Sequence, residues 1–76
     1  MTQIHISGKN WIVNWNDVKI VEWNLASNSL RFDEFVVLLP PDTIFGFDRF
    51  KNEIADTFDN DMQYALLDIN DYCFSK

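Results

Sequence analysis

The chain has 76 residues, 47% of them hydrophobic, and carries a formal net charge of −6 at pH 7. This length fits one domain over residues 1–76 with a single hydrophobic core, and three Trp, seven Phe and two Tyr argue against a disordered chain. The negative charge disfavours direct binding to nucleic acid or to an anionic membrane surface, and it favours a basic protein as partner.

Short segments rich in β-branched and aromatic residues predict strands in the first half of the chain. They are residues 3–7, 11–15, 18–23 and 30–39. Polar residues 7–10 and 24–29 supply turns between them, and connections this short allow an antiparallel meander without a crossover helix. We therefore expect one antiparallel sheet of about four strands within residues 2–39.

The periodicity changes after Pro40 and Pro41. Apolar side chains then recur at helical spacing, at Phe47, Phe50, Ile54 and Phe58. This stripe predicts an amphipathic helix over about residues 47–58.

A second stripe follows, at Met62, Ala65, Leu66 and Ile69. It predicts a helix over about residues 61–69 with its N-cap within residues 59–61, although residues 64–69 also fit a buried strand. The predicted fold class is therefore α+β, with one or two short helices packed on one face of the sheet.

His5 and Cys73 are the only residues of their types. On an alternating strand His5 fits a partly exposed surface position, and no nucleophile or orienting partner for it can be named. Cys73 lies between two aromatic residues, which suits a buried, weakly reactive thiol. A lone cysteine and the absence of a leader-like pattern in residues 1–8 favour a cytoplasmic location.

Metal and cofactor motifs are missing from the sequence. Asp59 and Asp61 suggest a calcium loop, but Tyr64 and Asn70 stand where such a loop needs Gly and Glu. The two glycines lie far apart, and neither precedes the Lys-Ser or Lys-Thr pair of a phosphate-binding loop. We therefore expect no enzymatic activity, no metal and no cofactor.

Trp11, Trp15 and Trp23 lie in the least acidic part of the chain. Stacking on nucleobases would require a basic groove beside them, which the composition does not provide. We expect two of the three in the core and one exposed as an anchor for a partner.

The acidic residues are concentrated in the second half. Residues 1–32 have a net charge of +1 and residues 33–76 a net charge of −7, and residues 52–75 contain six acids without a Lys or Arg. On the predicted helix Asp48, Asp56 and Asp59 share one edge with Asn52, with neighbours about 5 to 6 Å apart. Such charges either keep the domain soluble or form a binding surface that resembles a row of phosphates.

The candidate partner-binding residues are Asp48, Glu53, Asp56, Asp59, Asp61, Asp68 and Asp71, with Asp56, Asp59 and Asp61 foremost. Small size, aromatic richness and missing catalytic motifs resemble the general type of phage or mobile-element inhibitors that imitate DNA. The leading hypothesis is a non-catalytic anti-defence inhibitor that covers the basic nucleic-acid-binding surface of a nuclease or DNA-binding regulator. The alternatives are an antitoxin or immunity protein that blocks a toxin, and a self-associating structural subunit such as a homodimer.

Overall fold

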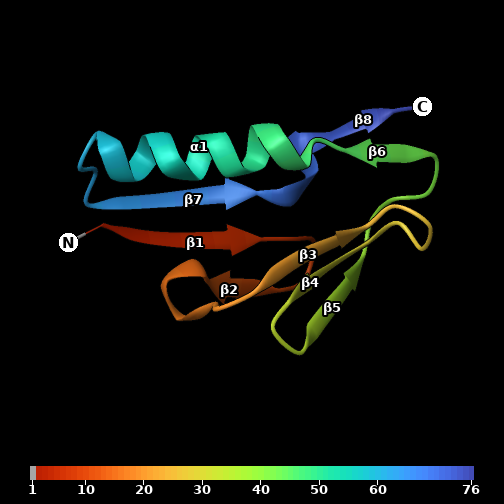
Figure 1. Ribbon diagram of the computed structural model, residues 1–76, viewed down its shortest axis with the longest axis horizontal. Coiled ribbons are helices and arrows are strands. Elements are labelled where there is room, and N and C mark those ends of the chain that lie inside the picture. The colour runs from red at the N-terminus through yellow and green to blue at the C-terminus, as the bar shows by residue number, and fades with distance from the viewer. Residues whose placement is uncertain (1) are drawn as a thin grey trace.

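The computed structural model describes residues 2–76 and has an α+β architecture (Figure 1). The strands are β1 (Gln3–Ser7), β2 (Ile12–Asn14), β3 (Val21–Asn24), β4 (Ser29–Phe32), β5 (Phe35–Leu38), β6 (Thr43–Phe45), β7 (Tyr64–Asp68) and β8 (Cys73–Ser75). The α-helix is α1 (Phe47–Asp59), and two short 3₁₀ helices are η1 (Trp15–Asp17) and η2 (Ile69–Tyr72). The strands form sheets in the orders β2-β1-β7, β3-β4-β5 and β6-β8.

The hydrophobic core is shared by the three sheets and α1. Its buried members are Ile4, Ile6, Leu30, Phe32, Val37, Leu39, Phe45, Phe50, Ile54, Leu67, Ile69 and Tyr72. All three tryptophans are half-buried and pack against this core, so the expectation that one of them is exposed is wrong. Each indole contributes apolar area to a domain too small to leave it in water.

The α+β class is confirmed, but the predicted single sheet of about four strands is wrong. Within residues 2–76 the sheets have three, three and two strands. Residues 30–39 do not form one strand, because the chain turns at Asp33 and Glu34 between β4 and β5. Before the turn the even-numbered residues, such as Phe32, are buried. After the turn the odd-numbered residues are buried instead, so Val36 is exposed.

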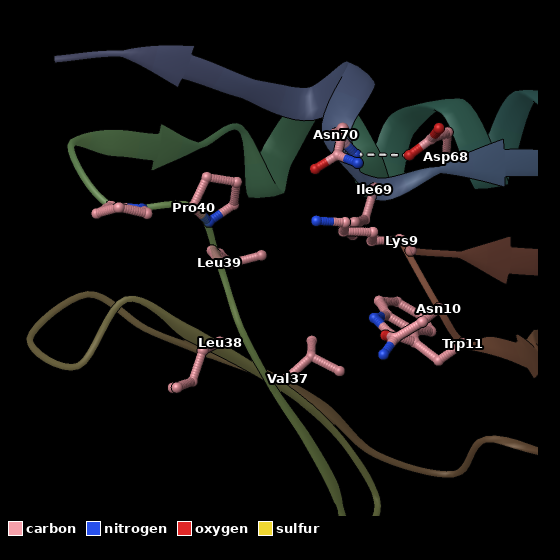
Figure 2. Close-up of a pocket in the computed structure, with 12 residues that line it drawn as sticks. Lys9, Asn10, Trp11, Val37, Leu38, Leu39, Pro40, Asp68, Ile69 and Asn70 are labelled. Carbon is pink, nitrogen blue, oxygen red and sulfur yellow. Dashed lines mark hydrogen bonds between the residues drawn. The ribbon is translucent and has the colours of Figure 1, made fainter.

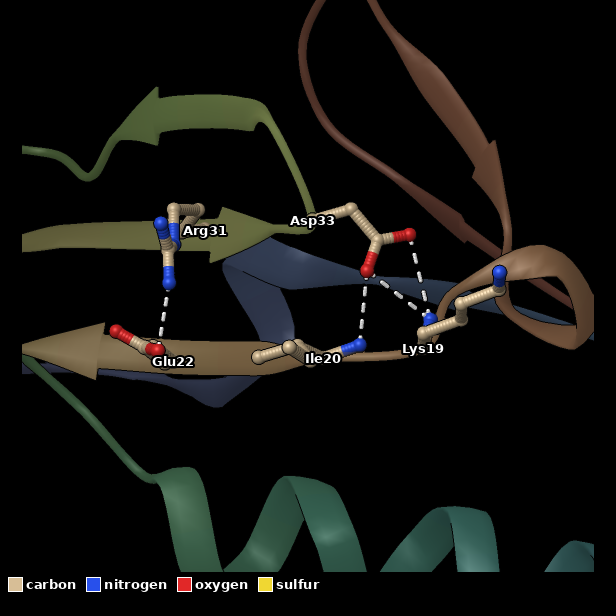
Figure 3. Close-up of polar contacts among 5 residues, drawn as sticks. All are labelled: Lys19, Ile20, Glu22, Arg31 and Asp33. Carbon is tan, nitrogen blue, oxygen red and sulfur yellow. Dashed lines mark hydrogen bonds and ion pairs between the residues drawn. The ribbon is translucent and has the colours of Figure 1, made fainter.

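Asp33 makes this turn possible. Its φ of 56° lies in the left-handed region, which Asp tolerates better than most residues. Its carboxylate accepts hydrogen bonds from the backbone N–H groups of Lys19 (3.1 Å) and Ile20 (2.8 Å), as Figure 3 shows. The turn is therefore fixed to the chain segment that leads into β3.

α1 confirms the helix predicted over residues 47–58, and it buries Phe50, Ile54 and Thr57. The helix predicted over residues 61–69 is wrong, because residues 64–68 form β7, which pairs in parallel with β1. The alternative prediction of a strand over residues 64–69 agrees with β7 in type. The strand is not buried on both faces, because one side of β7 is exposed. The predicted N-cap within residues 59–61 is wrong too, since Asn60 instead ends α1.

β6 and β8 were not predicted, because each has only three residues and pairs with a segment that is distant in the chain. They pair with each other beyond the N-terminal end of α1 (Figure 1). Within residues 2–76, no helix combines the length and apolarity needed to cross a membrane.

Candidate functional site

An acidic edge runs along α1, and it consists of Asp48, Asp56 and Asp59 with Asn52 between them. All four side chains are exposed, on the side of the helix away from buried Phe50 and Ile54. The amphipathic pattern dictates this arrangement, because the apolar stripe fixes which side of the helix faces the core. These four residues therefore share one exposed edge of the folded helix.

The two cations of α1 do not neutralise this edge beyond its first turn. The guanidinium carbon of Arg49 lies 5.3 Å from the ring centroid of Tyr72 and 5.7 Å from that of Phe74. The ammonium of Lys51 lies 4.6 Å from the ring centroid of Phe47, and its Nζ is 3.9 Å from Oδ1 of Asp48. Both positive charges therefore stay near the N-terminal end of the helix.

Asp56 and Asp59 lie at the C-terminal end of α1, where negative charge is unfavourable. The last turn contains no basic residue. Over residues 2–76 the ion pairs are Lys51 with Asp48 and Arg31 with Glu22, so neither acid is paired there. The partial negative charge of a helix C-terminus repels such a carboxylate by about 0.3 to 1 kcal/mol. These two residues therefore oppose the stability of the helix that presents them.

Asp61 extends the acidic edge past the end of α1. It has a φ of 53°, and its N–H donates to the carbonyl of Phe58 at 3.0 Å, which keeps it against the last turn. Asp61 is exposed, as Asp56 and Asp59 are. The structure thus brings the three foremost candidates together at one end of the molecule, and we call them the acidic cluster.

Of the remaining candidates, Asp48 lies on the acidic edge and Glu53 one turn before Asp56, whereas Asp68 and Asp71 belong to β7 and η2. Glu53 and Asp71 are exposed near Tyr72, whose pKa both of them raise. Asp68 lies in register with Ser7 on the face of the first sheet that is turned away from the core, and its Oδ1 accepts a hydrogen bond from the N–H of Asn70 at 2.9 Å. Asp68 therefore caps η2, and the seven candidates do not form one continuous surface.

A groove beside β5 was not predicted from the sequence (Figure 2). A pocket of about 630 Å³ is lined by residues 8–11, 37–41 and 68–70, and an adjoining pocket of about 480 Å³ is lined by Asn10, Trp11 and β5. Trp11 lies between them, with its ring centroid 5.8 Å from that of Phe32 and 5.6 Å from that of Phe35. The only sequence signal was the uncharged run over residues 35–39, which forms part of the strand predicted over residues 30–39.

Gly8 allows Trp11 to take this position. A Cβ atom on Gly8 would overlap the indole ring, so the close approach requires glycine there. The N–H of Gly8 also donates to the carbonyl of Trp11 at 2.9 Å. The turn between β1 and β2 therefore holds the indole as one wall of the groove.

His5 and Cys73 both lie half-buried. The ring of His5 packs beside that of Tyr64, with 5.4 Å between the centroids. Burial raises the pKa of the Cys73 thiol, which lowers the fraction of reactive thiolate, and Sγ lies 3.5 Å from the carbonyl oxygen of Ile69. Among residues 2–76, no three His, Cys, Asp or Glu side chains gather in a way that could hold a metal ion.

No protein-family model, no curated protein and no solved structure matches this chain.

Proposed function

We propose that this chain is a non-catalytic protein-binding module whose acidic cluster occupies a basic, nucleic-acid-binding surface of a partner protein. The observation that carries the proposal is the position of Asp56 and Asp59, exposed at the C-terminal end of α1 without a neutralising cation among residues 2–76. Asp61 adds a third exposed carboxylate at the same end of the molecule.

The position of these charges favours binding over a purely solubilising role. Solubility depends on the net charge of the surface, which acids at any exposed position could provide. Asp56 and Asp59 instead stand where the helix dipole penalises them. Departures from such local stabilising rules are expected at functional sites of natural proteins.

The chemistry of the acidic cluster indicates the kind of partner. Adjacent carboxylates on one helix edge attract the Lys and Arg side chains that otherwise contact the phosphate backbone of DNA or RNA. A nuclease or a DNA-binding regulator presents such a surface, and an inhibitor of this kind fits an anti-defence role in a phage or mobile element. An antitoxin or immunity protein would use the same attraction toward one dedicated toxin.

Capture from a host-cell lysate on the immobilised protein tests the proposal. The binding variant carries Asp56→Asn, Asp59→Asn and Asp61→Asn, and a control with the same net charge carries Asp17→Asn, Glu22→Gln and Asp42→Asn. We expect wild type and control to retain a basic nucleic-acid-binding protein that high salt or excess duplex DNA releases, and the binding variant to lose it. Equal capture by both variants would contradict the proposal.

A further inference from the structure

We propose that the open edge of β5 is the seam of a symmetric dimer, in which β5 of a second copy adds antiparallel to β5 of the first. This surface is separate from the acidic cluster, so the inference stands independently of the proposed function. In Figure 1 β5 and α1 lie on opposite sides of the molecule.

The backbone of β5 has unpaired groups along one edge. Among the strands of residues 2–76, β5 is hydrogen-bonded to β4 alone. The N–H of Leu39 donates to the carbonyl of Asn28 at 2.9 Å, so residues of odd number turn their backbone groups toward β4. Because these groups alternate along an antiparallel strand, those of Val36 and Leu38 point outward.

The side chains of β5 lack the features that protect natural edge strands. Such strands carry Lys, inward-pointing charges, proline or a bulge, which discourage pairing with another chain. Residues 35–39 are uncharged, and Pro40 follows β5 rather than interrupting it. Val36 is 54% exposed and Leu38 81% exposed, so an apolar strip borders the open edge.

The groove provides room for the side chains of an added strand. Its two pockets share Asn10, Trp11, Val37 and Leu38, and they adjoin β5. Side chains of a strand alternate between the two faces of a sheet, so every second residue of an added strand would enter the groove against Trp11. The remaining side chains would lie beside Val36 and Leu38 on the outer face.

The sequence of β5 is complementary to itself. With Val37 opposite its own copy, Val36 pairs with Leu38 of the second copy and Leu38 with its Val36. The outward backbone groups of these residues then exchange four hydrogen bonds across the two-fold axis. The four side chains on the outer face are all apolar, which suits cross-strand packing.

The charge distribution selects a second copy as the occupant. Two chains of net charge −6 repel each other least where they meet through uncharged strands, with their acidic helices on the far sides. In the same register Glu34 of the second copy comes opposite Pro40, beside the pocket lined by Lys9 and by Asp68, whose carboxylate accepts the N–H of Asn70. The two-fold axis places Glu34 of one copy near Lys9 of the other at both ends of the seam.

Sedimentation velocity over a range of protein concentrations tests the dimer. We expect a concentration-dependent dimer for wild type, and a monomer for the Val36→Lys, Leu38→Lys variant with the circular dichroism of wild type. Leu66→Lys, on the exposed side of the edge strand β7, is the matched control and should leave the dimer intact. The Asp56→Asn, Asp59→Asn, Asp61→Asn variant should also remain a dimer.

Two further variants keep the test valid if the double lysine variant does not fold. Val36→Pro removes one outward N–H and should raise the dimer dissociation constant at least about tenfold, which is the effect of losing about 1.4 kcal/mol. Lys9→Glu and Glu34→Lys should each weaken the dimer, and their combination should restore it. A wild-type monomer at all concentrations, or a dimer disrupted by Leu66→Lys and unaffected by the β5 variants, would overturn the inference.

Discussion

The guanidinium of Arg49 lies over the ring of Tyr72, 5.3 Å from its centroid, while its Nη1 donates to the carbonyl of Asp71 at 3.3 Å. This contact joins the first turn of α1 to η2, and therefore to the chain that continues from β7 into β8. It also directs the positive charge of Arg49 toward aromatic rings and away from the acidic edge. The acidic edge of α1 therefore stays negative beyond its first turn, because Arg49 contacts Tyr72 and Lys51 contacts Phe47 and Asp48.

Replacement of Arg49 by Gln should lower the free energy of unfolding by about 1 kcal/mol. The variant loses a cation–π contact and a charge-assisted hydrogen bond, each of about this size or smaller at a partly exposed site. Urea denaturation measures the effect. Lys19→Gln is the control for the change of net charge, and an equal loss in both variants would show that the contact with Tyr72 contributes nothing.

The stability of the protein should fall at alkaline pH because of Tyr72. Burial raises the pKa of its phenol above the usual 10.0, the charge of Glu53 raises it further, Arg49 lowers it and Asp71 raises it. The folded state therefore keeps this proton to a higher pH than the unfolded state. The stabilisation is fully present below about pH 10 and is lost as the pH rises through the folded pKa.

Urea denaturation between pH 8 and pH 11 measures this dependence. The pKa of Cys73 is raised by burial as well, so the series should be run in a Cys73→Ala background. Tyr72→Phe in the same background should flatten the decline above pH 10. A decline that persists unchanged without the phenol would assign the effect to other groups.

Asp59→Asn should stabilise the fold while it weakens partner binding. Removing a negative charge from the C-terminal end of α1 should raise the free energy of unfolding by about 0.3 to 1 kcal/mol at low salt. Asp48→Asn is the matched control, because Asp48 lies in the first turn beside Lys51 and its loss should destabilise. Thermal unfolding should show a higher melting temperature for Asp59→Asn and a lower one for Asp48→Asn. Both changes should become smaller at high salt. If Asp59→Asn destabilises, Asp59 is a structural residue.

Asp33→Ala should destabilise the protein by about 1 to 2 kcal/mol. The substitution removes the acceptor for the N–H groups of Lys19 and Ile20 and places a Cβ-bearing residue without a polar side chain at a φ of 56°. Asp33→Asn keeps an acceptor oxygen and tolerates this φ, so it should cost less. Chemical denaturation of both variants compares them, and equal losses would contradict the role given to the carboxylate.

The spacing of apolar residues along the chain was enough to predict α1. It was not enough to predict segments whose structure depends on pairing with a distant strand. α1 was predictable because its apolar residues follow a period of 3.6 without interruption. Residues 64–69 carry both helical and alternating patterns, and pairing with β1 selects the strand. The break between β4 and β5 was hidden by apolar residues on both sides of Asp33 and Glu34.

The candidate surface was predictable only in part for the same reason. Asp56, Asp59 and Asp61 are neighbours in sequence, so their clustering follows from a single helix and its end. Asp68 was grouped with them, yet its strand carries it to the outer face of the first sheet, where it caps η2. The groove could not be predicted, because its walls come from three segments far apart in the chain.

Displacement of proteins from immobilised duplex DNA tests the central claim most directly. A host-cell lysate is loaded on the DNA, and the purified protein is added as the eluent at low salt. We predict that wild type elutes a specific basic protein, that the Asp17→Asn, Glu22→Gln, Asp42→Asn control does the same, and that the Asp56→Asn, Asp59→Asn, Asp61→Asn variant elutes none. Elution of the same proteins by all three, or of none by wild type, would contradict the claim that the acidic cluster competes with nucleic acid.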